Sequence, residues 1–421
     1  MGRRRQTYLT STGPIPRDHR GPVPDHNPLD VGTRPRNEWR MVAAMDWPVI
    51  GFWVGLLIPA VSYLLYPLAV VGLGRLVRSS RLNVDGPWPD LTVAIAAHNE
   101  EATIERAVRS VLDQEYPGPR VSVSVGLDGC TDRTLGVLQA MQDPRLTILD
   151  LPRAGKAATD NRLVAAAQSD VVVTTSAGSE FAPGALADLA GPFRDPRVGC
   201  VTGVFRPRPG STDAEQGEGL YWRFEYLVMN AESRLGLLAM ASGTALAFRR
   251  ALFRPIPADS DADVVVAPTV ALLGSRVVHV PSAVVFDDGP ATLEAVLRSR
   301  RRMALRALPA TLDLVPRLLA AGRFGAAFGL IAHKVFRWLT PAAGVLWVIS
   351  AGALIAAPNP TYAPVIIGLV VGAALLFAVG LAYRRTRGAI ASLALAQLAF
   401  SLALFDVIRG RRARMWTRQP E

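Results

Sequence analysis

The sequence predicts an α/β domain with a mostly parallel sheet, joined to one N-terminal and about three C-terminal membrane-spanning helices. Two observations support this fold class. Long apolar runs stand near both ends of the chain, and 50% of the 421 residues are hydrophobic. Between the runs, from about residue 85 to 310, strand-like and helix-like patterns alternate. Alternation is typical of a parallel sheet, because a crossover must carry the chain back between two parallel strands.

The N-terminal part contains two segments. Residues 1–45 are rich in Arg, Pro and Gly and poor in large apolar side chains, so we expect them to be disordered. Residues 46–77 are almost uncharged and form a predicted transmembrane helix, since about 20 apolar residues suffice to cross a bilayer. The run is too long, and too far from the first residue, for a signal peptide.

The domain over residues 85–310 opens with four predicted strands. These are Leu91–Ala97, Val121–Asp128, Leu146–Leu151 and Val171–Thr175. Polar side chains follow them, including His98 after the first strand, Asp128 at the end of the second and Lys156 after the third. Ligands bind at the carboxyl ends of parallel strands, and such side chains suit a nucleotide. A Rossmann dinucleotide site is the alternative, but no GxGxxG follows the first strand.

Four stretches resemble, in order, motifs of the family-2 inverting glycosyltransferases: "VAIAAHNEEATI", "GLDGCTDRT", "RAGKAATDN" and "FAPGALADLAGPF". The resemblance extends from about Val93 to Pro341 and is typical of membrane-bound polysaccharide synthases. It implies the GT-A fold, a Rossmann-like arrangement, and a nucleotide-diphosphate sugar as donor, most often a uridine diphosphate sugar. The donor-binding residues it implies are His98, Glu100, Asp128, Lys156, Asn161, Ser176 and Gly178. Glu100 and Asp128 would hold the uridine; the alternative for each residue is a capping or surface role.

The second half of the domain resembles the acceptor side of membrane-bound family members. Trp222 would stack on a sugar, or would belong to the core, and Gly243 in "SGTALAFRR" would line the acceptor pocket. Asp263 matches the aspartate that serves in the family as the general base, although Ala262 replaces its usual acidic neighbour. A base must lie within hydrogen-bond reach of the proton that it removes. A helix cap is the alternative role of Asp263.

The metal motif of the family is altered in this chain. Ser176 and Gly178 occupy the positions of two carboxylates, whereas Mg²⁺ and Mn²⁺ prefer carboxylate oxygens as ligands. The Mg²⁺ or Mn²⁺ implied by the resemblance would need other ligands, and Glu180 is the nearest carboxylate. Two alternatives are that Lys156 and arginines neutralise the diphosphate, or that the domain binds a donor without turning it over.

A second motif is altered in the basic run "LRSRRRMALR". Related synthases carry a Gln-x-x-Arg-Trp motif here, but Ser299 and Met303 replace its glutamine and tryptophan. This loss weakens the case for a processive polysaccharide synthase. We assign the diphosphate or the acceptor to the arginines of the run, which are Arg300, Arg301 and Arg302.

The C-terminal part is expected to bind the membrane. Residues 311–337 are predicted interfacial helices, residues 338–408 contain three transmembrane runs, and residues 409–421 form a basic tail. The runs are Trp338–Ala356, Tyr362–Tyr383 and Ala389–Ile408. The uncharged loop "PNPT" indicates the outside and "RRTR" the cytoplasm. We therefore expect a multi-pass cell-membrane protein with a cytoplasmic catalytic domain, although the last run, which contains Asp406, need not cross completely.

The charge and the cysteines limit the partners. The net charge is +11, and its arginines concentrate beside the apolar runs, which favours contact with anionic membrane lipids over nucleic acid. The two cysteines show no metal-ligand spacing and fit a reducing compartment. No nucleic-acid partner is therefore expected.

These observations predict a membrane-bound inverting glycosyltransferase. It would transfer a sugar from a nucleotide-diphosphate sugar to a lipid-linked or cell-envelope glycan acceptor. The two altered motifs favour the alternative, an inactive family member that serves as a scaffold or regulatory subunit in polysaccharide biosynthesis. The presence of Asp128, Lys156 and Asp263 favours activity.

Overall fold

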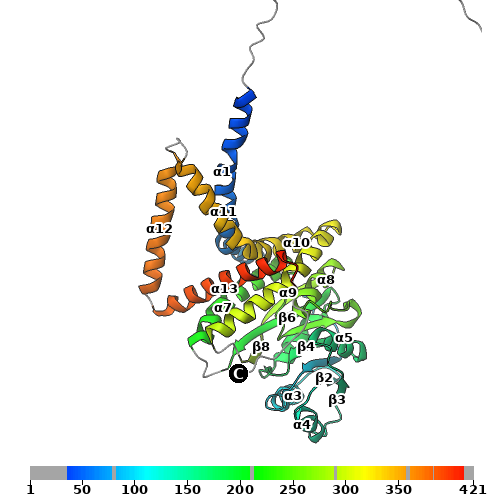
Figure 1. The fold of residues 1–421 in the computed structure, drawn as a ribbon. Helices are drawn as coiled ribbons and strands as arrows, with labels where there is room; N and C mark the ends of the chain where they lie inside the picture. The colour runs from blue at the N-terminus through cyan, green and yellow to red at the C-terminus, as the bar shows by residue number, and fades with distance from the viewer. Residues whose placement is uncertain are drawn as a thin grey trace, which may run out of the picture. The chain divides into compact units, whose positions relative to one another are not determined.

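The fold is that of a computed structural model, which describes residues 36–77, 82–208, 213–288, 292–356, 361–382 and 384–411 (Figure 1). The chain divides into two compact units after Asp46, and the following description concerns the unit that begins at Trp47. Residues 1–35 and 412–421 lie outside the described residues. Residues 36–45 differ from the expectation of disorder, because they belong to helix α1 (Arg36–Ala60). This stretch contains neither proline nor glycine, the two strongest helix breakers.

An eight-stranded sheet forms the centre of the globular domain. Its strands are Leu91–Ala97 (β1), Val121–Asp128 (β2), Leu146–Leu151 (β3), Val171–Ser176 (β4), Glu180–Phe181 (β5), Val198–Pro207 (β6), Leu246–Arg249 (β7) and Arg276–Asp287 (β8). The strand order is β3-β2-β1-β4-β7-β6-β8-β5. The pairs β3-β2, β2-β1 and β1-β4 are parallel, which confirms the prediction for the first half. β7 runs antiparallel to both β4 and β6, and β5 runs antiparallel to β8.

Helices cover both faces of the sheet because the side chains of its apolar strands alternate between the faces. Along β1, Val93 and Ile95 belong to one buried cluster and Ala94 and Ala96 to another. The first cluster includes α3 (Ile104–Leu112), α4 (Thr134–Ala140), α6 (Ala185–Ala190) and the 3₁₀ turn Gly191–Arg194. The second includes α5 (Lys156–Ala166), α7 (Asp213–Leu235), the 3₁₀ turn Arg250–Leu252, α8 (Ala262–Leu272) and α10 (Phe324–Leu330).

Helix α9 (Leu293–Ala320) differs from the domain boundary that the sequence indicated. It continues without a break through residue 310, where the globular domain was expected to end. Two prolines, Pro309 and Pro316, lie inside it. The composition around residue 310 therefore marks no structural boundary.

Among the described residues, four helices are long and apolar enough to cross a membrane. They are Trp47–Leu76, Phe324–Ala356, Tyr362–Ala382 and Ile390–Ile408. The first joins α1 to α2 (Tyr66–Leu76) through the π-helical turn Val61–Leu65. The second joins α10 to α11 (Phe336–Ala356) through the π-helical turn Ile331–Val335, so it begins well before the expected start at Trp338. The third is α12, and the fourth is most of α13 (Arg384–Ile408).

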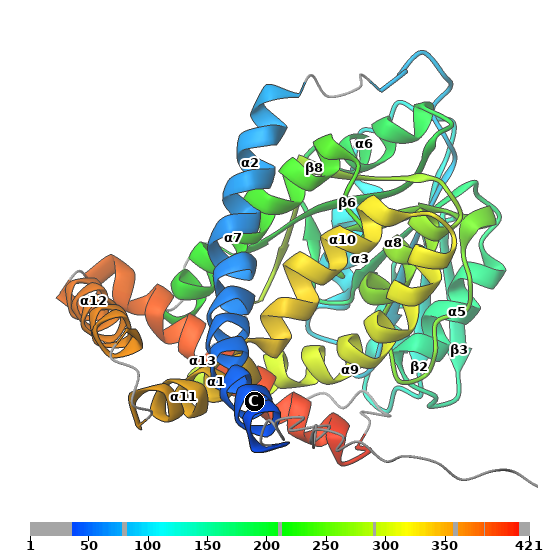
Figure 2. The same ribbon diagram turned by 90° about the horizontal axis from the view of Figure 1, so that it is seen from above.

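Helix α13 has different surroundings from α12. It lies along α9 and also contacts α7, whereas α12 stands apart from the globular domain (Figures 1 and 2). Ala396, Phe400 and Ala403 of α13 are buried in one cluster with Ala304 and Leu308 of α9. α13 is therefore packed against the globular domain by one of its faces.

Candidate active site

The candidate site lies at the carboxyl ends of three neighbouring parallel strands. The register pairs Ala97 of β1 with Leu127 of β2, and Ala96 of β1 with Ser176 of β4. The residues that follow β1, β2 and β4 therefore meet at one edge of the sheet. This is the edge at which ligands bind in open α/β sheets.

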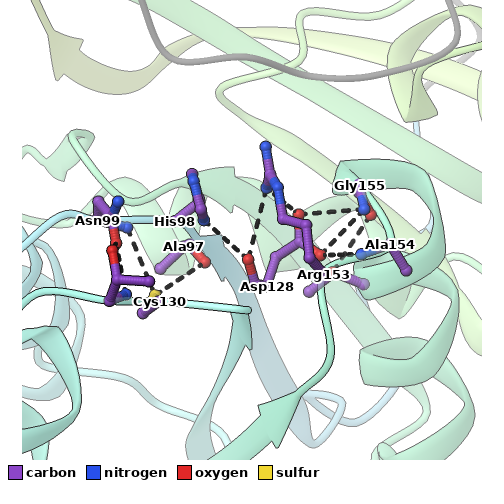
Figure 3. A network of polar contacts seen from close by, with 10 residues as sticks. Ala97, His98, Asn99, Asp128, Cys130, Arg153, Ala154 and Gly155 are labelled. Carbon is purple, nitrogen blue, oxygen red and sulfur yellow. Dashed lines mark hydrogen bonds and ion pairs between the residues drawn. The ribbon is translucent and has the colours of Figure 1, made fainter.

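Asp128 fixes the loop that precedes α5 (Figure 3). Its buried carboxylate accepts hydrogen bonds from the backbone N–H groups of Ala154 (2.6 Å) and Gly155 (2.9 Å) and pairs with Arg153. His98 Nδ1 donates to the Asp128 carbonyl oxygen over 2.8 Å, since a carbonyl can only accept. The resemblance implied a uridine contact for Asp128, but both of its carboxylate oxygens already have partners within the protein. Asp128 shapes the site through this loop.

Two other expected donor-binding residues hold backbone segments. The Glu100 carboxylate accepts a hydrogen bond from Thr103 Oγ1 (2.8 Å) at the start of α3. The Asn161 side-chain amide donates to the Ile256 carbonyl (2.9 Å), and its oxygen accepts from the Ile256 N–H (2.8 Å). Asn161 therefore anchors the segment between β7 and α8, because both ends of its amide are engaged there. This is a structural role that the sequence motif did not indicate.

Asp263 lies in the first turn of α8, against Gly243. A β-carbon on Gly243 would lie 3.4 Å from the Asp263 carboxyl carbon, so this glycine leaves room beside the carboxylate. Burial, followed by the charge of Asp261, raises the pKa of Asp263 to about 7. Asp261 itself pairs with the buried Arg306 over 2.9 Å. The structure thus places Gly243 beside the Asp263 carboxylate, two residues to which the resemblance gave roles on the acceptor side.

Lys156 begins α5 and faces the same acidic residues. Its Nζ is 3.1 Å from Asp160 Oδ2. Burial alone would lower the pKa of Lys156, but the charges of Asp160, Asp261 and Asp263 raise it above its usual value. The charges of the surrounding acidic residues, Asp263 among them, therefore favour the protonated form of Lys156.

The basic run of α9 does not converge on this site, which is a correction to the sequence-based assignment. Arg300 donates to Ser392 of α13 over 3.0 Å, Arg301 pairs with Asp406 of α13 over 2.9 Å, and Arg302 is exposed. Successive residues on a helix point about 100° apart, so three adjacent arginines cannot face one ligand. Arg306, further along α9, is the arginine that pairs with Asp261.

Trp222 belongs to a stack of aromatic rings between α7 and the sheet. Its ring lies on Tyr226 with centroids 5.6 Å apart, and Tyr226 lies on His279 of β8, also at 5.6 Å. Tyr226 therefore covers one face of the Trp222 ring, and the Trp222 side chain is half-buried. The side chain of Tyr221 lies outside the described residues.

Glu225, one turn along α7, lies in a buried cluster of charged groups. It pairs with Arg337 and accepts from Lys334 Nζ and His333 Nε2, each at 3.1 Å. His333 Nδ1 is 2.8 Å from Glu232. The Tyr66 hydroxyl of α2 donates to Glu232 over 2.6 Å. We call these residues the α7 ion cluster; it joins α7 to α2 and to the start of α11.

The residues after β4 do not fit a divalent metal ion. Ser176 offers a hydroxyl and Gly178 no side chain, and Glu180 pairs with Arg208 (3.0 Å) and Arg106 (3.4 Å). Within the described ranges, no group of three or more His, Cys, Asp or Glu side chains is arranged to hold a metal. The expectation that Glu180 would serve as a metal ligand is therefore not supported by its contacts.

Asp287 and Arg208 are two residues of this region that the sequence did not indicate. Asp287, at the end of β8, accepts a hydrogen bond from Ser179 Oγ over 2.6 Å. Its Oδ1 would lie 3.1 Å from a β-carbon placed on Gly178. Arg208 donates to the carbonyl oxygen of Gly178. Both residues come from strands far along the chain, and no local motif marks them.

The sequence profile described as glycosyl transferase family 2 matches residues 92–256. An N-acetylglucosaminyltransferase of Rhizobium leguminosarum is 26% identical over 259 residues, or 56% of this chain and 60% of that protein. A beta-monoglucosyldiacylglycerol synthase of Synechocystis is 30% identical over 120 residues, or 27% of this chain and 25% of that protein. The chain spans about half the length of the curated relatives that it matches.

One solved structure covers most of the chain. It is a mannosyltransferase from Pyrobaculum calidifontis, determined in complex with GDP-Man and Mn²⁺. The match has a TM-score of 0.62 and 22% identity, and it covers 85% of this chain and 99% of the other. At this identity the likeness concerns the fold alone.

Proposed function

We propose that this protein, which carries a family-2 glycosyltransferase domain of the GT-A fold, is an inverting transferase at a membrane. It would transfer a sugar from a nucleotide-diphosphate sugar to a hydroxyl group of a lipid-linked or cell-envelope glycan. The observation that carries the proposal is the position of Asp263, a carboxylate beside Gly243 and Lys156 at the ligand-binding edge of the sheet.

The proposed reaction has one displacement step. Asp263 takes the proton from the acceptor hydroxyl, whose oxygen forms a bond to the anomeric carbon of the donor sugar. The bond from that carbon to the diphosphate oxygen breaks on the opposite side, and the configuration inverts. A base is most effective when its pKa lies near the working pH, so a pKa of about 7 for Asp263 suits this role. Lys156, which pairs with Asp160, would lie on the donor side of Asp263.

The acceptor is proposed from the surroundings of the domain. Four helices are apolar and long enough to cross a membrane, and three of them, α1–α2, α10–α11 and α13, contact the globular domain. The Synechocystis relative is named as the synthase of a glycolipid. A membrane-bound acceptor is therefore the substrate class that we propose. A uridine diphosphate sugar is the donor that we would try first, with a guanosine diphosphate sugar second.

The rate of transfer is expected to increase as the pH rises through about 7. Asp263 accepts a proton only when it is ionised, and its pKa is raised to about 7. Below that pH most of the base is already protonated, and above it the base is available. Measurements of kcat/KM from about pH 5 to 9 should show one ionisation with a midpoint near 7. Asp261→Asn should move the midpoint to lower pH, because it removes a charge that raises this pKa; an unmoved midpoint would argue against Asp263 as the group observed.

The test of the proposed function is release of nucleoside diphosphate by the full chain in lipid nanodiscs. The assay uses a panel of uridine and guanosine diphosphate sugars, with lipid extract supplying the acceptor. Radiolabelled sugar recovered in the lipid fraction would support the proposal. Failure of every nucleotide sugar to bind, measured by calorimetry, would overturn it.

A second candidate function is favoured by the loss of carboxylates at Ser176 and Gly178. The domain would then bind a nucleotide sugar as a scaffold or regulatory subunit of a polysaccharide-producing assembly. Donor binding without product release or transfer, in the presence of acceptor lipids, is the result expected for that function. Labelled lipid product would exclude it.

A further inference from the structure

A half-buried arginine, Arg208, occupies the region in which the family resemblance places a metal ion. Arg208 follows β6 and donates to the carbonyl oxygen of Gly178. It also pairs with Glu180 over 3.0 Å and with Asp288. Gly178 is one of the two positions that lost a metal-binding carboxylate, and Glu180 is the carboxylate nearest to it. The guanidinium group of Arg208 therefore contacts both Gly178 and Glu180.

The carboxylates around Gly178 already have partners within the protein. Glu180 is held by Arg208 and by Arg106 of α3. Asp287 receives hydrogen bonds from the Ser179 hydroxyl (2.6 Å) and the Asp288 N–H (2.8 Å). A divalent ion would have to displace Arg208 in order to reach Glu180. The region thus contains a resident guanidinium group, and its carboxylates are engaged in contacts within the protein.

Arg208 retains capacity to bind a further anion. Its Nε–H is buried and has no hydrogen-bond partner among the described residues. Its pair with Asp288 is weakly held, because 65% of the Asp288 side chain is exposed and exposed pairs contribute little. Arginine donates from a planar fork that matches phosphate oxygens. An unused buried donor and an exchangeable partner are what an anion site at this arginine requires.

We propose that Arg208 binds the diphosphate of the nucleotide sugar and supplies the positive charge that a divalent metal ion supplies in relatives. This inference rests on the proposed function. The leaving diphosphate gains negative charge as the glycosidic bond breaks, and a fixed cation beside it lowers that barrier. Lys156 cannot replace Arg208 in this respect, since its charge is largely balanced by Asp160. The donor is then expected to bind without metal.

The experiment compares diphosphate binding in the presence of a metal chelator. Calorimetry of the full chain in detergent measures the affinities of UDP, GDP, uridine and guanosine, first with EDTA and then with Mg²⁺ or Mn²⁺. The difference between a nucleoside diphosphate and its nucleoside isolates the contribution of the diphosphate. The variants are Arg208→Gln and, as a matched control, Arg106→Gln. Arg106 pairs with the same Glu180, but 56% of its side chain is exposed, and the hydrogen bond to the Gly178 carbonyl comes from Arg208.

The expected result is tighter binding of the diphosphate than of the nucleoside in EDTA. Arg208→Gln should reduce that advantage about 10- to 100-fold, as loss of a charge-assisted hydrogen bond does, and Arg106→Gln should keep it. Diphosphate binding that needs metal would overturn the inference and leave the proposed function intact; this arm uses the wild-type chain and needs no folded variant. Equal affinities of Arg208→Gln and wild type would also overturn it. No nucleotide binding under any condition would overturn both.

Discussion

Replacing Asp263 with asparagine is expected to slow sugar transfer by about 10²- to 10⁴-fold, the usual contribution of a general base. Asparagine has nearly the same shape, so Gly243 still accommodates it, but its amide cannot accept the acceptor proton. The donor should bind as before, because Asp261 and Asp263 lie on the acceptor side of Lys156 in the proposed mechanism. The measurement is the initial rate of labelled-sugar transfer, together with the donor affinity from calorimetry.

A matched control is Asp313→Asn on α9. Asp313 is exposed and pairs with Arg317 one turn away on the same helix. Its replacement should leave the transfer rate unchanged. Full activity of the Asp263→Asn variant would remove Asp263 as the base. A loss of donor binding in that variant would instead place Asp263 on the donor side.

Replacing Glu225 with alanine is expected to destabilise the protein strongly, by about 3–5 kcal/mol. Glu225 and Arg337 are both 1% exposed, and Glu225 also pairs with Lys334 and His333. Removing the carboxylate leaves the buried Arg337 and the nearby Lys334 without their shared counter-charge, and it leaves His333 Nε2 without its acceptor. The α7 ion cluster joins α7 to α2 and α11, so the contact between the globular domain and those helices should loosen first.

Thermal unfolding in detergent, followed by the fluorescence of a thiol dye at the buried Cys200, measures this effect. Glu294→Ala on α9 is the control, since Glu294 pairs with Arg298 on the helix surface and such exposed pairs contribute about 0.3–0.5 kcal/mol. An unfolding temperature of Glu225→Ala equal to that of Glu294→Ala would show that the α7 ion cluster contributes little to stability.

The sequence was sufficient for the features that depend on short-range patterns. The alternation of apolar strands and amphipathic helices predicted the parallel half of the sheet, and uninterrupted apolar runs predicted the four candidate spans. Asp263 was proposed from a motif, and its position in the first turn of a helix agrees with the helix-cap alternative as well as with the role of base. These features are local because each is determined by residues that lie within a few turns of one another.

Features that depend on contacts between distant segments could not be predicted. Arg208 and Gly178 are 30 residues apart in the sequence. The order of β6 and β8 in the sheet brings them together, and no sequence motif indicates that order. The partners of the arginine run could not be predicted for a different reason. A run of like charges shows that a helix surface is basic, but the partner of each arginine is chosen by the neighbouring helix, which here is α13 with Ser392 and Asp406.

The contact between Arg301 and Asp406 has a consequence for how the chain is arranged across a bilayer. A helix that is packed on a water-soluble domain and tied to it by an ion pair is suited to lie in the plane of the lipid headgroups, with its apolar side toward the acyl chains. Two crossings, Phe324–Ala356 and Tyr362–Ala382, would then separate the globular domain from α13. Because this number is even, the arginines that follow Ile408 would emerge on the same side as the globular domain. That side would be the cytoplasmic one by the positive-inside rule. A reporter fused directly after Ile408 should therefore be digested by protease in inverted vesicles and protected in intact cells.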